Sequence, residues 1–309
     1  MRYGFASVSD SFPQPADETR AGIVIVFYRP NQECVARANR LARMWPCVVV
    51  DNSEERVTAS ERGLNCNVEY LANGANLGIA TALNQGVDRL IAKGLTCALL
   101  FDQDSEPSAT LLAELPRTLA TERARDARVA IVGPAYEDAR LGGVAPFVRF
   151  GFLKLQRIVP AGRQPVEVDF LITSGSCVNL MVWHSVGPME DALFIDFVDL
   201  EWCIRAKSKG FLLLGAPALH LAHELGGEPV RVFGRTYPGH GPVRHYYLFR
   251  NAVALILRSY VPWSWKSTEL IKMPFRLVIY GLFMRPRLAH LRLSLLGICH
   301  GLMGRAGAL

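Results

Sequence analysis

The feature that most constrains the fold is a series of apolar runs that alternate with helical patterns through the first hundred residues. The runs occupy residues 22–28, 47–50, 68–71 and 97–101. Runs of this length are typical of strands buried on both faces, as in parallel sheets. Between them, residues 33–45 and 81–92 have the apolar spacing of amphipathic helices. This alternation predicts an α/β fold with a mostly parallel, doubly wound sheet.

Beyond residue 128 the alternation fades. The remaining strand candidates are residues 129–134, 166–172 and 211–214, and a loop running into a helix is expected over 194–209. Residues 1–20 are polar, contain Pro13 and Pro15, and lack the apolar stretch of a secretory signal. We therefore expect a disordered or loosely packed lead-in over 1–20, an α/β domain over 21–251 and a helical region over 252–309.

The last of these regions is both basic and apolar. From Arg244 onward there are ten Lys or Arg residues and a single acid, Glu269, whereas the net charge of the whole chain is only +6. The helical pattern is expected to break at Pro262, Pro274 and Pro286, and its longest uncharged stretch, 293–304, is too short to span a bilayer. A basic, apolar, helical segment predicts association with an anionic membrane surface rather than with nucleic acid.

Two common protein classes are disfavoured. No G-x-G-x-x-G follows the first apolar run, where Phe27-Tyr28-Arg29-Pro30 stands instead, so the chain does not fit a dinucleotide-dependent oxidoreductase. The seven cysteines include no C-x-x-C pair and mostly lie in apolar runs, which indicates free thiols in a reducing cytosol.

Two carboxylates end the fourth apolar run. Asp102 and Asp104 are two residues apart, so in an extended segment their side chains point the same way. Ligands of α/β sheets bind at the carboxyl ends of the strands, and paired carboxylates suit Mg²⁺ or Mn²⁺ shared with substrate phosphates. The D-x-D pattern is unspecific by itself, and a solvated acidic turn before Pro107 is the alternative.

Several segments together resemble the family 2 glycosyltransferases, which have the GT-A fold, and in particular bacterial rhamnosyltransferases of O-antigen and exopolysaccharide assembly. In order, the matching segments are Val26-Phe-Tyr-Arg-Pro-Asn31, Val48-Val-Val-Asp-Asn-Ser53, Asn76-Leu-Gly-Ile-Ala-Thr-Ala-Leu-Asn-Gln-Gly86, Phe101-Asp-Gln-Asp-Ser105, Ile172-Thr-Ser-Gly-Ser176, Leu193-Phe-Ile-Asp-Phe-Val-Asp-Leu-Glu-Trp-Cys-Ile-Arg205 and Arg244-His-Tyr-Tyr-Leu-Phe-Arg-Asn251. They span residues 21–251, and the last two are much more specific than D-x-D. The resemblance implies a GT-A fold and transfer of a sugar from a nucleotide diphosphate donor.

For the donor, the resemblance implies that Asp104 holds the divalent metal, and that Asp102 reaches the ribose or assists the metal, with Gln103 between them. Cations are needed there because cleavage develops negative charge on the diphosphate. Tyr28 would support the nucleoside, with Arg29 close to it.

Asp51, followed by Asn52, would accept a hydrogen bond from the imide N–H of uracil or thymine. A helix-capping turn at residues 51–53 is the alternative. Asn76 and Gly78 form a tight loop before a helix, where backbone N–H groups favour anions, and Asn84 lies in that helix. For these three residues, turn geometry and packing is the competing interpretation.

The catalytic base implied by the resemblance is Asp199, with Asp196 as the rival. An inverting transfer needs a carboxylate that takes the proton of the acceptor hydroxyl. Family 2 usually has Glu-Asp here, whereas this chain has Val198-Asp199, with Glu201 and Trp202 as acceptor contacts. Helix capping for Asp196 and Glu201, and core packing for Trp202, are the alternatives.

Further acceptor contacts are expected from Ser174 and Gly175, because a glycine lets the backbone approach a ligand closely, unless this is a plain turn at the end of a strand. His223 matches a metal-closing histidine of relatives, and His220 competes with it.

Arg244, Tyr247 and Arg250 have helical spacing at the mouth of the expected site. Arg244 or Arg250 would stabilise the departing diphosphate, and Arg244 and Tyr247 would contact the acceptor. A basic interfacial helix is the alternative interpretation, and both can hold.

The leading hypothesis is an inverting, metal-dependent enzyme that moves L-rhamnose from dTDP-L-rhamnose to a lipid-linked oligosaccharide at the cytoplasmic face of the inner membrane. A second hypothesis keeps the fold and changes the donor to a UDP-hexose. A third is a catalytically silent scaffold that binds sugar nucleotides. The first requires Asp51, Asp104 and Asp199 to meet in one cleft.

Overall fold

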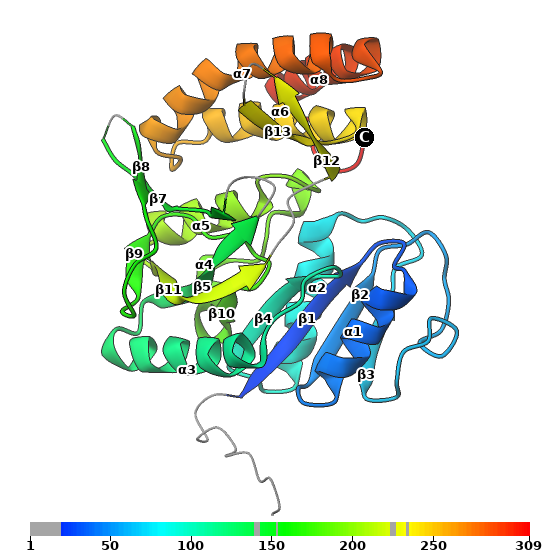
Figure 1. Cartoon of the computed structure of the whole chain (residues 1–309), viewed down its shortest axis with the longest axis vertical. Helices are drawn as coiled ribbons and strands as arrows, with labels where there is room; N and C mark the ends of the chain where they lie inside the picture. The colour runs from blue at the N-terminus through cyan, green and yellow to red at the C-terminus, as the bar shows by residue number, and fades with distance from the viewer. Residues whose placement is uncertain (1–19, 139–142, 153, 223–226, 233–234) are drawn as a thin grey trace, which may run out of the picture.

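The structure is a computed structural model that describes residues 20–138, 143–152, 154–222, 227–232 and 235–309 (Figure 1). The expected lead-in, apart from Arg20, and His223 lie outside these residues.

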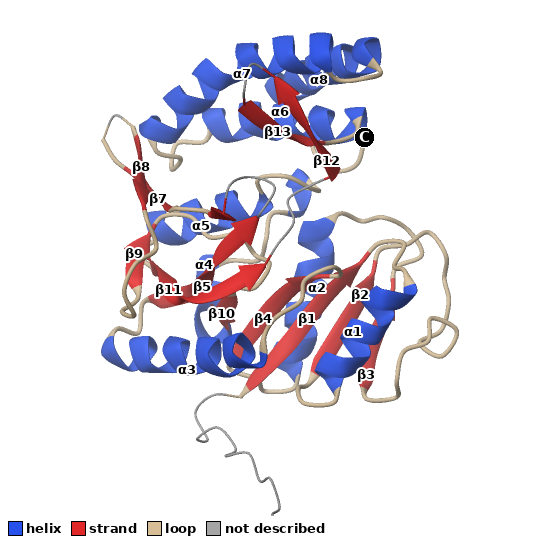
Figure 2. Ribbon diagram, viewed as in Figure 1, coloured by secondary structure: helices blue, strands red, loops and turns tan. Residues whose placement is uncertain are grey.

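The four apolar runs form four adjacent parallel strands, as predicted. β1 (Ala21–Phe27), β2 (Cys47–Asp51), β3 (Val68–Ala72) and β4 (Cys97–Asp102) are arranged in the order β3-β2-β1-β4. Helices cover both faces of this sheet (Figure 2). α1 (Gln32–Ala42) and α3 (Ala109–Arg125) pack against alternate β1 side chains such as Ile23 and Ile25, whereas α2 (Ile79–Ala92) packs against Val24 and Val26. The carboxyl ends of β1 and β4 therefore lie side by side.

Antiparallel strands join the sheet in the second half of the domain. β10 (Cys177–Asn179) lies antiparallel between β4 and β5 (Val129–Asp138), and β11 (Leu212–Ala222) runs parallel to β5. β9 (Val166–Val168) and β6 (Gly143–Val144) add short antiparallel edges. The sheet is therefore mixed, with its parallel half where the sequence predicts it.

Several features were not predicted from the sequence. They include α3, the short strands β6 and β10, and the hairpins β7 (Phe147–Phe150) with β8 (Leu155–Ile158) and β12 (Gly227–Val232) with β13 (Arg235–Gly239). Pro116 inside α3 masks its helical signal. The signals present were the Ser108 cap, whose side chain accepts from Leu111 N–H at 3.1 Å, and the spacing of its buried leucines.

Three short helices lead into α5 (Val198–Ser208), the helix that carries the expected base Asp199. They are η1 (Leu180–Val182), α4 (Trp183–Val186) and η2 (Asp191–Leu193). α5 begins close to the carboxyl end of β4, because its Val198 and Asp199 line a common cavity with Asp102. The loop-then-helix pattern predicted over 194–209 is confirmed.

The C-terminal region forms three helices: α6 (Pro242–Leu257), α7 (Trp263–Phe283) and α8 (Arg287–Leu302). They lie together beside the α5 end of the sheet domain (Figure 1). Pro262 and Pro286 stand at helix starts, but α7 continues through Pro274, so the predicted break there is wrong; a proline inside a helix can be accommodated as a local bend. Among the described helices, none combines the length and apolar character needed to cross a bilayer.

α8 packs closely on α6 through two glycines. A side chain at Gly301 would approach the Arg250 carbonyl oxygen to 2.7 Å, and one at Gly297 would collide with the Tyr246 carbonyl. The expected domain boundary at residue 251 falls inside α6. α6 therefore links the sheet domain to the two helices that follow.

Candidate active site

A cavity of about 470 Å³ lies at the carboxyl ends of β1 and β4, where ligands of α/β sheets bind. The end of β4, the 172–174 turn, the segment before α5 and the start of α6 contribute its walls. Its polar lining residues are Tyr28, Asp102, Gln103, Asp104, Thr173, Ser174, Asp196, Asp199 and Arg244. Both the D-x-D carboxylates and the expected base therefore face one space.

Asp102 and Asp104 project into this cavity from the end of β4. Asp102 N–H donates to Ser174 Oγ at 3.3 Å, and Ser174 Oγ lies 2.7 Å from Ser105 Oγ. Asp104 is exposed, and no other described residue forms a hydrogen bond or ion pair with its carboxylate. A metal ion that is held by two carboxylates keeps coordination positions for phosphate oxygens, and this arrangement suits Mg²⁺ or Mn²⁺. Among the described residues there is no group of three acids, histidines or cysteines that would hold a metal alone.

The segment before α5 is strained. Phe194, Asp196 and Phe197 have φ angles of 64°, 64° and 62°, which non-glycine residues rarely adopt. Such conformations cost about 1–3 kcal/mol each and persist only when the surroundings hold them. Asp196 lines the cavity, its Oδ1 pairs with Arg244 Nε at 3.0 Å, and its buried Oδ2 has no hydrogen-bond partner among the described residues.

Asp199 lies in the first turn of α5. Its Oδ1 accepts from Leu200 N–H at 2.8 Å. Burial raises the pKa of Asp199 from 3.8 to about 6, and the nearby charges of Asp196 and Asp102 act in the same direction. Burial also raises the pKa of Asp196, but the Arg244 guanidinium opposes that rise. Arg244 pairs with Asp196, whereas no cation among the described residues pairs with Asp199, so Asp199 is the better candidate for the base.

Asp51 does not reach the cavity, so only two of the three expected acids meet there. It is the last residue of β2, which pairs with β1 on the side away from β4, and it is buried. Its Oδ1 accepts from Ser53 N–H at 2.8 Å; its Oδ2 accepts from the Tyr70 hydroxyl at 2.8 Å and pairs with Arg62 Nε at 2.9 Å. The carboxylate is engaged by its own neighbours, which fits the alternative of a structural turn.

Tyr28 and Gln103 form one wall of the cavity. Tyr28 N–H donates to Gln103 Oε1 at 2.8 Å, and Gln103 Nε2 donates to Tyr28 O at 3.2 Å. Arg29 lies outside the lining; its guanidinium sits over the Tyr28 ring at 5.1 Å and pairs with Glu54 at 2.9 Å. The Tyr28 ring is therefore backed by a cation and remains partly exposed to the cavity.

The residues expected to bind the diphosphate at the start of α2 hold loops instead. Asn76 Oδ1 accepts from Gly78 N–H at 3.0 Å, and Gly78, with φ of 88°, packs against Phe194 where no side chain would fit. Asn52 Nδ2 donates to Gly78 O at 2.8 Å. Asn84 donates to Met189 O and accepts from Met189 N–H, at 2.9 and 2.8 Å. None of these residues lines the cavity.

Among the expected acceptor contacts, Ser174 lines the cavity but Gly175, Glu201 and Trp202 do not. Glu201, two positions after Asp199, points to the other side of α5 because a helix turns 100° per residue. Glu201 is fully buried, pairs with Arg205 at 2.8 Å and accepts from the Tyr260 hydroxyl at 2.6 Å. Trp202 is stacked on Trp183, with ring centroids 5.7 Å apart. Both have structural roles in this arrangement.

α6 places only Arg244 in the cavity. Tyr247 is buried behind the strained segment and stacks on Phe194, with ring centroids 4.8 Å apart. Arg250 is buried and donates to the backbone carbonyls of Ala192 and Leu193 at 3.0 and 2.9 Å, so it cannot contact a diphosphate in this arrangement. His220, the rival metal ligand, pairs with Glu137 at 3.0 Å outside the cavity lining.

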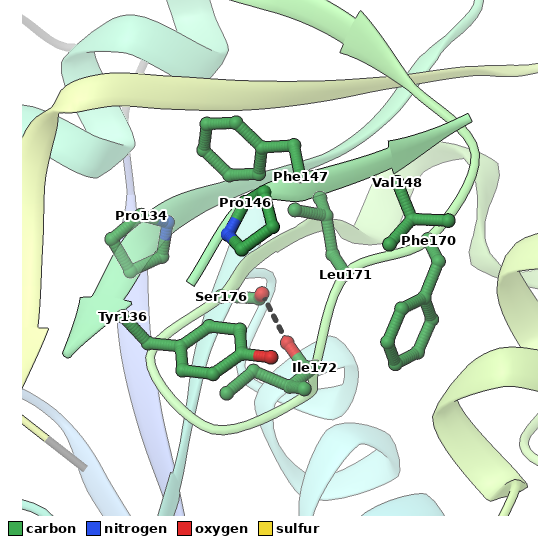
Figure 3. Close-up of a pocket in the computed structure, with 9 residues that line it drawn as sticks. All are labelled: Pro134, Tyr136, Pro146, Phe147, Val148, Phe170, Leu171, Ile172 and Ser176. Carbon is green, nitrogen blue, oxygen red and sulfur yellow. Dashed lines mark hydrogen bonds between the residues drawn. The ribbon is translucent and has the colours of Figure 1, made fainter. Parts of the chain in front are cut away.

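A second, apolar cavity of about 20 Å³ adjoins the first and shares Ile172 with it. Tyr136, Phe147 and Phe170 line it (Figure 3). Burial raises the pKa of Tyr136, and the charge of Asp199 contributes. This cavity is large enough for a single water molecule or a methyl group.

The chain is similar to known proteins in both sequence and fold. The chain is 28% identical over 288 residues to the dTDP-rhamnosyl transferase RfbF of Shigella flexneri, which covers 92% of this chain and 96% of that protein. No family model matches the sequence.

Two solved structures resemble the fold. One is GalNAc-T7 with UDP, GalNAc and Mn²⁺, with a TM-score of 0.57, 14% identity, and coverage of 82% of this chain and 51% of that chain. The other is residues 1–349 of Staphylococcus aureus TarS, with a TM-score of 0.51, 12% identity, and coverage of 92% and 81%. The chain has the GT-A fold of these solved structures and is similar along nearly its whole length to a protein named as a bacterial dTDP-rhamnosyl transferase.

Proposed function

We propose that this chain is an inverting, metal-dependent rhamnosyltransferase of family 2 that uses dTDP-L-rhamnose as donor. The observation that carries the proposal is that Asp102, Asp104 and Asp199 face a single cavity in a chain related along 92% of its length to a dTDP-rhamnosyl transferase. The proposed acceptor is a lipid-linked oligosaccharide of surface polysaccharide synthesis, at the cytoplasmic face of the inner membrane.

In the proposed reaction, Asp199 accepts the proton of the acceptor hydroxyl. At the same time the hydroxyl oxygen bonds to the anomeric carbon of the donor sugar, and the bond from that carbon to the diphosphate breaks. A base with a pKa of about 6 is ionised near neutral pH and still basic enough to take that proton. Arg244, which lines the cavity, would balance charge on the departing diphosphate.

Asp102 and Asp104 would hold Mg²⁺ or Mn²⁺. The bound cation would neutralise the charge that develops on the diphosphate as it leaves. The solved GalNAc-T7 structure of the same fold contains Mn²⁺ and UDP, which supports a divalent cation here. Tyr28 and Gln103 would contact the nucleoside from the adjoining wall, and Ser174 the acceptor.

Nucleotide-dependent thermal stability tests this proposal. We expect dTDP with Mn²⁺ to raise the melting temperature of the full chain more than UDP with Mn²⁺, and neither to do so without metal. In Asp104→Asn the metal-dependent part of this stabilisation should be lost. A preference for UDP would favour a UDP-hexose donor instead, and binding without any release of dTDP from dTDP-L-rhamnose would favour a silent scaffold.

We further propose that α7 and α8 lie on the membrane. On α7, exposed Ile271, Phe275, Val278 and Leu282 recur every three or four residues and form one apolar face. On α8, exposed Leu288, Leu295 and Leu302 recur every seven residues. Exposed cations such as Lys272, Arg287 and Arg292 accompany these leucines and aromatics, as expected for helices that bind an anionic surface.

Vesicle binding tests the membrane proposal. The full chain should sediment with vesicles that contain anionic lipid and much less with purely zwitterionic vesicles. The double variant Ile271→Ser/Phe275→Ser should lose most of this binding. Met181→Ser is the matched control, because Met181 is equally exposed at 67% but lies outside the helical region. Equal binding by both variants would show that the α7 face does not contact lipid.

A further inference from the structure

Two adjacent buried residues of α6, Arg250 and Asn251, have all their side-chain hydrogen bonds on backbone or on each other. Arg250 is 1% exposed and Asn251 is fully buried, although neither lines the cavity. Arg250 Nε donates to Asn251 Oδ1 at 2.9 Å, which fixes the two side chains relative to each other. Such a pair is costly to bury unless its donors find acceptors.

Their acceptors all lie in two short segments. Arg250 Nη2 donates to the carbonyls of Ala192 and Leu193, and Arg250 Nη1 donates to Gly307 O. Asn251 Nδ2 has three carbonyl oxygens within hydrogen-bonding distance: Leu193 at 2.9 Å, Ile195 at 2.7 Å and Asp196 at 2.9 Å. Gly307 N–H in turn donates to Ala192 O at 2.8 Å.

The segment held in this way is the strained one that turns Asp196 toward the cavity and begins α5. Three of its four residues from Phe194 to Phe197 have positive φ angles, so their conformation has to be imposed by neighbours. Arg250 and Asn251 bind carbonyls that directly precede these residues, at Ala192 and Leu193, and Asn251 also binds two within them, at Ile195 and Asp196. Asp199 follows two residues after Phe197, in the first turn of α5.

We propose that Arg250 and Asn251 are positioning residues that hold segment 192–197 in the conformation that presents Asp196 and Asp199 to the donor and acceptor. α6 and the chain end that follows α8 are then part of the active site's construction, in addition to any contact with a membrane. This inference rests on the proposed role of Asp199 in sugar transfer.

Few other side chains could form the hydrogen bonds that Arg250 and Asn251 make to these carbonyls. A guanidinium donates in several fixed directions at once, whereas a lysine ammonium in its place would reach fewer of the carbonyls. The amide Nδ2 of Asn251 is a donor, and a carboxylate of nearly the same shape has only acceptors to offer the three carbonyls. Asn251→Asp therefore changes the chemistry at this position with almost no change in volume.

The test compares Asn251→Asp with Asn179→Asp in the full chain. Asn179 is also a fully buried asparagine, and its Nδ2 donates to Val129 O at 2.8 Å, far along the sheet from segment 192–197. For dTDP release from dTDP-L-rhamnose in the presence of a membrane lipid extract, we expect Asn251→Asp to lower kcat at least tenfold and to change the donor KM less than threefold. Asn179→Asp should lower the melting temperature and leave kcat of the folded protein within twofold.

Hydrogen exchange supplies a readout that does not depend on transfer. Peptides covering residues 191–200 should exchange faster in Asn251→Asp than in Asn179→Asp, and Arg250→Lys should retain more activity and protection than Arg250→Ala. Unchanged exchange of this segment, or a kcat for folded Asn251→Asp within twofold of the parent, would overturn the inference. If residues 191–200 exchange faster in Asn251→Asp but the parent chain shows no sugar transfer, the positioning role stands and the proposed function is refuted.

Discussion

Replacing Asp199 with asparagine should remove activity and stabilise the protein at the same time. The change keeps the side-chain shape and the Oδ1 that accepts from Leu200 N–H at 2.8 Å. It removes a carboxylate that is buried beside the charges of Asp196 and Asp102. A purely structural aspartate that formed an ion pair would behave in the opposite way, because its loss would weaken the fold.

The size of the effect follows from the pKa of Asp199, which burial raises from 3.8 to about 6. The folded chain therefore holds this proton more tightly than the unfolded chain does, and the free energy of unfolding falls as pH rises through this interval. Above pH 6 the ionised carboxylate destabilises the folded state by up to ~3 kcal/mol, whereas below the unfolded pKa the penalty is absent. Losing a general base typically lowers the rate by about 10²–10⁴-fold.

Thermal unfolding and donor turnover measure the two effects. At pH 7.5 the melting temperature of Asp199→Asn should exceed that of the parent by several degrees, and the difference should shrink toward zero near pH 4. Release of dTDP should fall at least 100-fold while dTDP binding remains. Asp196→Asn is the matched comparison: it also removes a buried charge but breaks the pair with Arg244, so it should stabilise less. A lower melting temperature for Asp199→Asn at pH 7.5, or retained turnover, would refute this reasoning.

Three further outcomes are expected. The acidic limb of kcat/KM should rise with pH with a midpoint near 6, since Asp199 acts as a base only when ionised; a limb with its midpoint near pH 4 would point to an exposed carboxylate. Gly297→Leu should lower the free energy of unfolding by about 1–3 kcal/mol or more, because the added side chain meets the Tyr246 carbonyl, and denaturant titration would reveal no change if α8 were not packed there. Arg244→Gln should lower kcat at least tenfold through poorer stabilisation of the leaving diphosphate, and an effect confined to acceptor KM would assign Arg244 to the acceptor instead.

Local sequence patterns were sufficient for the elements that depend on burial alone. The runs that form β1, β2, β3 and β4 were located to within two residues, because strands buried on both faces need continuous apolar side chains. The D-x-D carboxylates were placed at the cavity for the same reason, since the side chains that follow a buried strand must emerge at its carboxyl end. α3 was missed because Pro116 interrupts a pattern that packing nonetheless maintains.

Residue roles within motifs were less predictable. Asp51, Glu201 and Arg250 are ionisable residues in segments that resemble a glycosyltransferase, yet each has its partners inside the protein. Their residue types suit both catalysis and structural support, and the sequence carries no record of which acceptors or cations lie nearby. For Asn251 the sequence predicted no role of its own. A role in holding segment 192–197 is visible only when α6 is packed against that segment.

Local sequence is enough to specify the parallel half of the sheet, the position of Asp102 and Asp104 at a strand end, and the basic, apolar character of the C-terminal helices. These properties follow from the order of neighbouring residues, which fixes side-chain direction and local burial. The packing of distant segments sets the rest: Asp199 lines the same cavity as Asp104 whereas Asp51 does not, and α6 supports the segment bearing Asp196. Those relations join residues about 50 to 100 positions apart, and their geometry depends on how strands and helices pack in three dimensions.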